Sequence, residues 1–176
     1  PLMLYLLGGQ RNESTGKSEN EGSNSPSALV QYAQTAIDLI ANSLASSIAI
    51  VGSRNPTPQG AANARHFAKA FSEAGLTVVS GLALGVDGAA HEGALDGLGP
   101  NDNRLATIAV VGTGLDRVYP KDHRDLAHRI AENGLIISEY PLGTPPQAEN
   151  FPKRNRLIAG LAQGTLVVEA ALKSGS

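Results

Sequence analysis

The sequence predicts an α/β protein with a doubly wound, mainly parallel sheet that carries helices on both faces. From about residue 47 onward, apolar runs of strand length alternate with segments of helical pattern. These apolar runs are continuous rather than alternating apolar with polar residues, which indicates strands buried on both faces, as in parallel sheets. Folds of this kind bind ligands at the carboxyl ends of their strands, so the residues that follow each strand are the candidates for function.

Five strands are expected in the repeating part, at residues 48–52, 76–81, 107–112, 134–140 and 165–170. Thr57-Pro58 is a helix-start signal, and it leads into four apolar residues at helical spacing, Ala64, Phe67, Ala68 and Phe71. Gly75 is a typical helix stop. Further helices are expected at about 87–97, 122–133 and 155–162.

The first 46 residues are expected to differ from the repeating part. Residues 1–9 predict a first strand, with the apolar run at 2–7 buried, and residues 10–25 a flexible polar insertion. Ser25-Pro26 starts an amphipathic helix over 26–46, with Leu29, Ala33, Ala36 and Ile40 on one face. Residues 47–176 then form the core. Because the chain opens on Pro1 and stops without a closing element, we expect it to be a piece of a longer protein.

Composition excludes several classes of function. The 176 residues fit one domain, and 41% hydrophobic residues can supply a core. The chain has no Cys, which rules out thiolate chemistry and disulfides and fits a cytoplasmic protein. No apolar run is long enough for a membrane span. From Ile48 onward, 12 Lys and Arg face 12 Asp and Glu, so bulk charge gives no support for nucleic-acid binding.

A turn with phosphate-binding features follows the first strand of the core. Gly52 lets the chain turn sharply, Ser53 offers a hydroxyl and a backbone N–H, and Arg54 presents a planar guanidinium that suits phosphate oxygens. The structural alternative is that Arg54 is a surface charge after a turn. Position in the sequence leaves both interpretations open.

The second strand leads into a loop with two glycines four residues apart, Gly81 and Gly85, and then a helix. This spacing predicts a backbone nest for an anion at the helix N-terminus, to which Ser80 can also donate. Asp87 is interpreted as the N-cap of that helix rather than as a functional carboxylate.

The third strand ends in Gly112-Thr113-Gly114, a partial G-x-G pattern. The third glycine of the dinucleotide fingerprint is missing, and no acidic residue ends the next strand at the ribose-binding distance, which argues against NAD. No cofactor is expected. The expected phosphate nest comprises the glycines of all three turns: Gly52, Gly85, Gly112 and Gly114.

The stretch 150–156 has the most distinctive composition. Lys153, Arg154 and Arg156 place three positive charges within four residues, close to the aromatic Phe151. A basic cluster beside an aromatic ring can hold a nucleic-acid backbone and stack on a base. The alternative is a solvated loop with Phe151 in the core.

Catalytic and metal-binding signals are weak. The four histidines (66, 91, 123 and 128) lack metal-ligand spacing, and no serine nucleophile motif is present. Glu139 and Glu169 each end a strand, where they can act as general bases, although a structural role is the simpler interpretation.

Taken in order, the motifs resemble those of the DprA/Smf family of DNA-processing proteins. The matching segments are Gly52-Ser53-Arg54, SGLALGVDGAAHEGAL at 80–95, GTGLDRVYP at 112–120, SEYPLGTPP at 138–146, FPKRNRLIAGLAQ at 151–163 and VVEAALKSGS at 167–176. The resemblance covers about residues 48–176, and the opening PLMLYLLGG also looks like the first strand of this core. The insertion and helix of residues 10–45 depart from the family pattern.

The resemblance implies an extended Rossmann-like core that binds single-stranded DNA without strong sequence preference, forms a homodimer and loads the RecA recombinase during natural transformation. It implies a positive DNA pocket formed by Ser53, Arg54, Ser80, Gly81, Phe151, Lys153, Arg154 and Arg156. Arg54 and Lys153 would hold phosphates, and Phe151 would stack on a base. For Arg154 and Arg156, bracing the loop is the alternative role.

Two other hypotheses stand beside DNA binding. Related folds include phosphoribohydrolases that cleave an N-glycosidic bond, and here Glu169 is the one candidate acid, although their P-G-G-x-G-T-x-x-E motif is incomplete at residues 164–169. A protein that only holds a partner through these loops is the third hypothesis.

Overall fold

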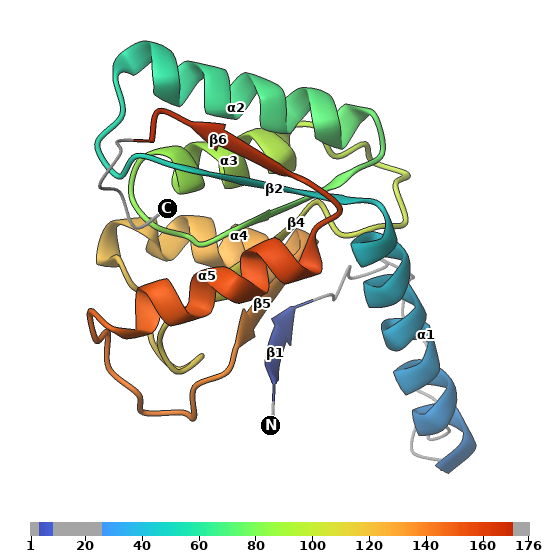
Figure 1. Cartoon of the computed structure of the whole chain (residues 1–176). Coiled ribbons are helices and arrows are strands. Elements are labelled where there is room, and N and C mark those ends of the chain that lie inside the picture. Colours follow the sequence, from blue (N-terminus) through green and yellow to red (C-terminus); the bar gives the residue numbers. More distant parts are fainter. Residues whose placement is uncertain (1–3, 9–25, 171–176) are drawn as a thin grey trace.

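A computed structural model describes residues 4–8 and 26–170 of the chain, and the predicted insertion at 10–25 lies outside them (Figure 1). The elements follow one another along the chain as β1 (Tyr5–Gly8), α1 (Pro26–Ala45), β2 (Ser47–Gly52), α2 (Pro58–Glu73), β3 (Thr77–Ser80), α3 (Val86–Asp96), β4 (Thr107–Val111), α4 (Arg124–Asn133), β5 (Leu135–Ser138), α5 (Asn150–Leu161) and β6 (Thr165–Val168). A 3₁₀ turn at Lys121–His123 precedes α4.

The strands form one six-stranded sheet in the order β1-β5-β4-β3-β2-β6. All neighbouring strands pair in parallel except β1, which runs antiparallel to β5. The predicted α/β fold with a mainly parallel sheet is therefore confirmed. The chain moves outward from β2 to β5 and then returns to the far side of β2 with β6. This reversal creates a topological switch point at the carboxyl ends of β2 and β6, where doubly wound sheets bind their ligands.

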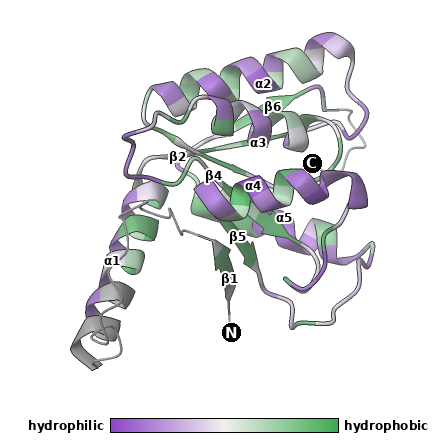
Figure 2. Ribbon diagram, turned by 180° about the vertical axis from the view of Figure 1, so that it is seen from behind, coloured by the Kyte–Doolittle hydropathy of each residue, from purple (hydrophilic) through white to green (hydrophobic). Residues whose placement is uncertain are grey.

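Helices cover both faces of the sheet, as predicted. On one face, α2 and α3 pack over Ile50 and Val78, and α4 packs over Ala109 and Ile136. On the other face, α5 contributes Ile158, and the C-terminal part of α1 adds partly buried residues to the same cluster. Hydrophobic residues concentrate on the strands, whereas the hydrophilic colour lies mainly on the helices and loops (Figure 2).

The start of α2 follows the predicted capping pattern. The Thr57 hydroxyl accepts a hydrogen bond from the Gly60 N–H at 3.1 Å, and Pro58 occupies the first turn, where its missing N–H costs nothing. Ala64 and Ala68 are buried as expected, but Phe67 is 48% exposed and stacks on Phe71 at the edge of the helix. The predicted helical spacing is present, but Phe67 lies toward solvent and not in the core.

The first strand differs from its prediction. We expected a buried strand at 2–7, but β1 (Tyr5–Gly8) is an edge strand, with Leu6 51% and Leu7 47% exposed. Its antiparallel pairing with β5 satisfies one side of its backbone and leaves its apolar side chains largely uncovered. An apolar composition cannot distinguish a central strand from an edge strand, because strand order is set by the chain connections.

The last helix also begins earlier than predicted. α5 starts at Asn150 rather than near residue 155, so the basic stretch lies on a helix and not on a loop. Pro152 is compatible with this start because the first turn of a helix needs no N–H donors. In the part of the chain that the structure describes, no helix is both long and apolar enough to cross a membrane.

Candidate nucleic-acid site

A small pocket of about 110 Å³ lies at the carboxyl edge of the sheet. Four separate segments contribute to its wall: the turn after β2, the loop after β3, the loop after β4, and α5. The lining residues are Arg54, Gly81, Ala83, Leu84, Tyr119, Pro120, Phe151 and Arg154. Four of the eight predicted DNA-binding residues therefore meet at one pocket, although they come from distant parts of the sequence.

One wall of this pocket is built from two aromatic rings and a guanidinium. The rings of Tyr119 and Phe151 lie 5.5 Å apart between centroids at an angle of 32°. The Arg54 guanidinium carbon lies 5.5 Å from the Phe151 ring centroid, which is a cation–π distance. Gly112 makes room for this ring, because a Cβ there would lie 3.1 Å from the Phe151 Cδ1 atom. Gly112 therefore acts as a packing position for Phe151.

Arg154 forms the floor of the pocket as a buried brace. It is 3% exposed, and its Nη1 donates hydrogen bonds to the carbonyl oxygens of Gly81, at 2.5 Å, and Val110. Burial lowers the pKa of this guanidinium, and the nearby Asp87 carboxylate opposes that effect. A Cβ on Gly81 would lie 2.4 Å from the Arg154 Nη1 atom, so Gly81 is needed for the arginine to fit. Of the two roles considered for Arg154, the structure shows the brace.

The predicted anion nest at the start of α3 is filled by a carboxylate of the chain itself. The Asp87 Oδ2 atom accepts hydrogen bonds from the backbone N–H groups of Gly81, at 3.2 Å, and Ala83, at 3.4 Å. The N-cap of α3 is Gly85, so the interpretation of Asp87 as N-cap is wrong. Burial raises the pKa of Asp87, and the positive charge of Arg154 acts in the opposite direction.

Two histidines, His91 and His123, contact the same loop at Leu82. The Leu82 N–H donates to His91 Nε2 at 3.2 Å, and the Leu82 carbonyl lies 3.0 Å from His123 Nδ1. His91 must then carry its proton on Nδ1, which lies 2.7 Å from the Thr107 hydroxyl. Burial, reinforced by the charges of His123 and Arg154, lowers the pKa of His91 to about 3, so the ring is neutral. These contacts support Leu82 in a left-handed conformation with φ 59°.

The two serines of the predicted site differ in accessibility. Ser80 is fully buried, its hydroxyl donates to the Ile50 carbonyl at 2.6 Å, and it also interacts with the buried Asp87 carboxylate, so it is not accessible to an external anion. The Ser53 hydroxyl accepts from the Asn55 N–H at 3.1 Å and can still donate its own proton outward. Gly85, with φ 78°, lets the loop approach this turn, because a Cβ there would lie 2.5 Å from the Ser53 carbonyl oxygen.

Gly52 and Gly114 of the expected nest make contacts within the fold. A Cβ on Gly52 would lie 1.9 Å from the Val168 carbonyl oxygen, so this glycine permits close pairing of β2 with β6. The Gly114 N–H donates to the Thr144 carbonyl at 3.1 Å and is not directed toward the small pocket. The glycines follow the strand ends as predicted, but they serve close packing rather than a shared backbone nest.

The other two cations of α5 lie on the outer surface. Lys153 is exposed and has a distant ion pair with Glu149 at 3.8 Å. Arg156 donates to both carboxylate oxygens of Glu139, at 2.5 Å and 2.6 Å. Lys153 therefore faces solvent, Arg154 faces the buried loop at Gly81, and Arg156 pairs with Glu139, whose side chain is 14% exposed.

The site also contains residues that sequence reasoning did not single out. Leu84 and Tyr119 line the small pocket and are 43% and 47% exposed, an unusual position for large apolar side chains. His123 and Asp87, considered from the sequence only as a metal ligand and an N-cap, also hold the loop at residues 81–83. The string Val118-Tyr119-Pro120 was visible within the family motif, but only the tertiary structure places Tyr119 against Phe151.

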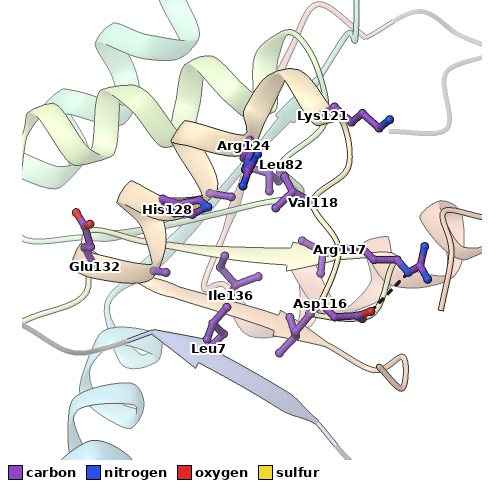
Figure 3. Close-up of a pocket in the computed structure, with 14 residues that line it drawn as sticks. Leu7, Leu82, Asp116, Arg117, Val118, Lys121, Arg124, His128, Glu132 and Ile136 are labelled. Carbon is purple, nitrogen blue, oxygen red and sulfur yellow. Dashed lines mark ion pairs between the residues drawn. The ribbon is translucent and has the colours of Figure 1, made fainter. Parts of the chain in front are cut away.

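A second, larger pocket of about 970 Å³ lies between β1 and α4 (Figure 3). Leu7, Leu82 and Ile136 contribute to its apolar wall, whereas Arg124 and His128 of α4 stand along its side. None of the predicted DNA-binding residues lines it. The loop 115–121 separates it from the small pocket, since residues of this loop line both.

Comparison with known proteins assigns this arrangement to a family. The sequence profile of the DNA recombination-mediator protein A family matches residues 20–176. Protein Smf of Synechocystis is 49% identical over 129 residues, which cover 73% of this chain and 31% of the relative. Protein Smf of Escherichia coli is 47% identical over 130 residues, which cover 73% of this chain and 33% of the relative. The chain thus spans about a third of the length of these relatives.

Two solved structures share the fold. DNA processing protein A (DprA) of Streptococcus pneumoniae is 43% identical with a TM-score of 0.69, and the match covers 80% of this chain and 46% of that one. The Helicobacter pylori protein, described for its single-stranded DNA binding mode, is 30% identical with a TM-score of 0.71, covering 98% and 62%. These matches confirm the predicted Rossmann-like fold. By sequence and by structure, the chain belongs to the DNA recombination-mediator protein A family, the DprA/Smf proteins.

Proposed function

We propose that this chain binds single-stranded DNA without strong sequence preference at the small pocket. The observation that carries the proposal is the convergence of Arg54, Tyr119 and Phe151 at the carboxyl edge of the sheet. A cation beside two accessible aromatic rings combines the two elements of sequence-independent single-strand binding, phosphate attraction and base stacking. The likeness to the Helicobacter pylori protein supports the same interpretation.

The predicted residues divide into two groups in this proposal. Arg54 and Lys153 hold phosphates, Phe151 stacks on a base, and Ser53 and Arg156 lie at the rim. Ser80, Gly81 and Arg154 shape the pocket from beneath and contact no DNA phosphate. The small volume of the pocket suits one flat ring rather than a whole nucleotide.

Side chains rather than helix N-termini supply the phosphate contacts. The loop before α3 is occupied by the Asp87 carboxylate, and the start of α2 is occupied by Glu169, whose carboxylate accepts from the Thr57 N–H at 2.7 Å. Flexible cations at the rim can follow a DNA backbone of any sequence. The proposal extends to the whole protein as the family resemblance implies: a cytoplasmic homodimer that loads RecA on single-stranded DNA.

The experiment that tests the proposal measures binding of a labelled single-stranded oligonucleotide by fluorescence anisotropy over a series of salt concentrations. Replacing Arg54 with Ala removes a charge-assisted phosphate contact, and we expect Kd to rise about ten- to a hundredfold. The slope of log K against log salt should become shallower by about 0.7, the value of one single-strand phosphate contact. The loss should be similar for oligonucleotides of different sequence.

The matched control is Arg65→Ala. Arg65 pairs with Glu92 and Asp96 on the surface of α2 and α3 and does not line the pocket. Replacing it with Ala removes the same positive charge as Arg54→Ala does. If Arg54→Ala binds as tightly as the parent, or if Arg65→Ala weakens binding equally, the pocket is not the DNA site.

The phosphoribohydrolase alternative is not favoured by the site. Glu169, its candidate acid, accepts hydrogen bonds from both the N–H and the hydroxyl of Thr57, and these bonds lower the pKa of Glu169. A carboxylate held in its ionised form is a poor proton donor to a leaving base. Release of free base from nucleoside monophosphates, abolished by Glu169→Gln, would contradict this assignment.

A further inference from the structure

Glu169 lies at the carboxyl end of β6, directly beside the turn that carries Arg54. Its Oε2 atom accepts from the Thr57 N–H at 2.7 Å, and its Oε1 atom accepts from the Thr57 hydroxyl. The same hydroxyl accepts from the Gly60 N–H at 3.1 Å and so caps α2. One carboxylate therefore fixes both the end of the turn at 53–57 and the start of the following helix.

Two further observations show that the chain is shaped around this contact. Glu169 has φ 52°, and in the part of the chain that the structure describes it shares a positive φ with only one other non-glycine residue, Leu82. Such a conformation is costly for a residue with a Cβ and persists where surrounding contacts impose it. In addition, the Glu169 carboxylate packs against Gly60, where a Cβ would lie 2.3 Å from the Glu169 Cδ atom and would displace the carboxylate from its present position.

The end of β6 also holds the beginning of the same turn. The Ser53 N–H donates to the Val168 carbonyl at 3.3 Å, and the Ser53 carbonyl accepts from the Val86 N–H at 3.0 Å. The turn is thus held at Ser53 through Val168 and at Thr57 through Glu169. Arg54 projects from between these two attachment points and reaches the Phe151 ring.

We infer that Glu169 is a positioning residue for DNA binding: its carboxylate holds Thr57 and thereby fixes the turn from which Arg54 reaches the small pocket. This inference rests on the proposed function of that pocket. It assigns to the glutamate a role that needs neither proton transfer nor contact with DNA. The lowered pKa of Glu169 agrees with an acceptor that is used in its ionised form.

The direction of the effect separates this role from simple electrostatics. Removing a negative charge near a DNA site should tighten DNA binding, because repulsion of phosphates is relieved. Losing the contact with Thr57 should instead weaken binding, because Arg54 is no longer held in place. In Glu169→Ala both acceptors are removed, so the contact with Thr57 is broken, whereas the amide oxygen of a Gln would still accept from the Thr57 N–H.

The test is a double-mutant cycle on the full chain, with labelled oligo-dT binding measured by anisotropy and folding checked by thermal unfolding. We expect Glu169→Ala to weaken binding about tenfold and to flatten the salt dependence as Arg54→Ala does. The variant that combines Glu169→Ala with Arg54→Ala should bind no more weakly than Arg54→Ala alone, because both changes remove the contact of Arg54 with DNA.

Two further variants control for charge and for the partner. Glu73→Gln removes the same charge from the far end of α2, where Glu73 pairs with Lys69 at 3.6 Å, and it should not weaken binding. Thr57→Ser keeps the hydroxyl and should bind like the parent, whereas Thr57→Ala loses the hydroxyl bond and should weaken binding in the direction of Glu169→Ala. Anisotropy and thermal unfolding are measured on the same protein sample. A loss of stability appears as a lower Tm and is thereby distinguished from a loss of DNA affinity.

The inference is overturned if Glu169→Ala binds as tightly as the parent or more tightly, or if its loss adds to that of Arg54→Ala in the double variant. If Arg54→Ala itself has no effect, the proposed DNA pocket fails and the positioning role fails with it. A loss with Arg54→Ala but none with Glu169→Ala leaves the pocket intact and removes only the positioning role.

Discussion

Two arginines line the same small pocket and differ in their surroundings. Arg154 is 3% exposed, donates to two main-chain carbonyls and balances a buried carboxylate. Arg54 is exposed, and its guanidinium lies over the ring of Phe151. The first arginine uses its Nη1 to hold two main-chain carbonyls, whereas the second presents its charge to solvent.

This difference shows that the number of basic residues in a motif does not tell how many of them can contact a ligand. Buried cations such as Arg154 are retained because the surrounding groups need them, and their removal leaves an unpaired charge. Exposed cations such as Arg54 contribute little to stability and are free to bind phosphate. We therefore expect stability and DNA affinity to respond to different residues of one pocket.

The largest expected effect is on stability, for Arg154→Met. The free energy of unfolding should fall by about 3–5 kcal/mol, because the Asp87 carboxylate loses its buried counter-charge and two carbonyls lose their donor. Urea unfolding followed by circular dichroism measures this change. Arg54→Met is the control and should lie within about 0.5 kcal/mol of the parent. Equal stability of the two variants would remove the distinction between the arginines.

The second effect is on DNA affinity, for Phe151→Ala. Loss of base stacking should reduce the binding free energy by about 1–3 kcal/mol in the anisotropy assay. Phe67→Ala is a matched control, because Phe67 is also a partly exposed aromatic residue but lies on α2 and stacks on Phe71. A comparable loss for both variants would indicate a general effect of apolar surface rather than a stacking site.

The third effect concerns pH and the neutral histidine beneath the loop. The pKa of His91 is lowered to about 3 by burial, with help from the charges of His123 and Arg154, whereas in the unfolded chain it is about 6.5. The contribution of His91 is fully present above pH 6.5 and is lost as pH falls toward 3. Unfolding free energy should therefore drop by about 2 kcal/mol between pH 7 and 5 from this residue.

Because other groups also titrate, the variant His91→Gln is needed to isolate the contribution of His91 to the unfolding free energy. Burial raises the pKa of Asp87, and a carboxyl with a raised pKa acts with the opposite sign, favouring the folded state as it takes up a proton. Urea unfolding at pH 7, 6 and 5 should give a flatter pH dependence for His91→Gln than for the parent. Parallel profiles would show that His91 is not the group that titrates.

The smallest effect is expected for Arg156→Gln. The exposed Arg156 pairs with Glu139, whose side chain is 14% exposed, and ion pairs that solvent reaches on one side contribute about 1 kcal/mol or less and weaken with salt. DNA affinity should fall less than in Arg54→Ala, since the guanidinium is already engaged by a carboxylate. A loss as large as that of Arg54→Ala would place Arg156 in the pocket's phosphate-binding group.

Much of the fold followed from local pattern. The order of helices and strands from residue 47, the mainly parallel sheet and the capping of α2 by Thr57 are all encoded by short-range spacing. The exposed edge position of β1 was not predictable, because Leu6 and Leu7 have the composition of a buried strand. The early start of α5 was missed because Pro152 marks a helix start less sharply than a preceding cap residue does.

The sequence by itself determined which residues reach the carboxyl edge of the sheet. Parallel strands direct their following turns to one edge, so the turns of Arg54, Gly81 and Gly112 had to be neighbours. Only the tertiary structure decided which side chains line the small pocket. Asp87 fills the nest, Arg154 turns inward and Glu169 holds Thr57, because these depend on contacts between segments far apart in the chain, which no local pattern records.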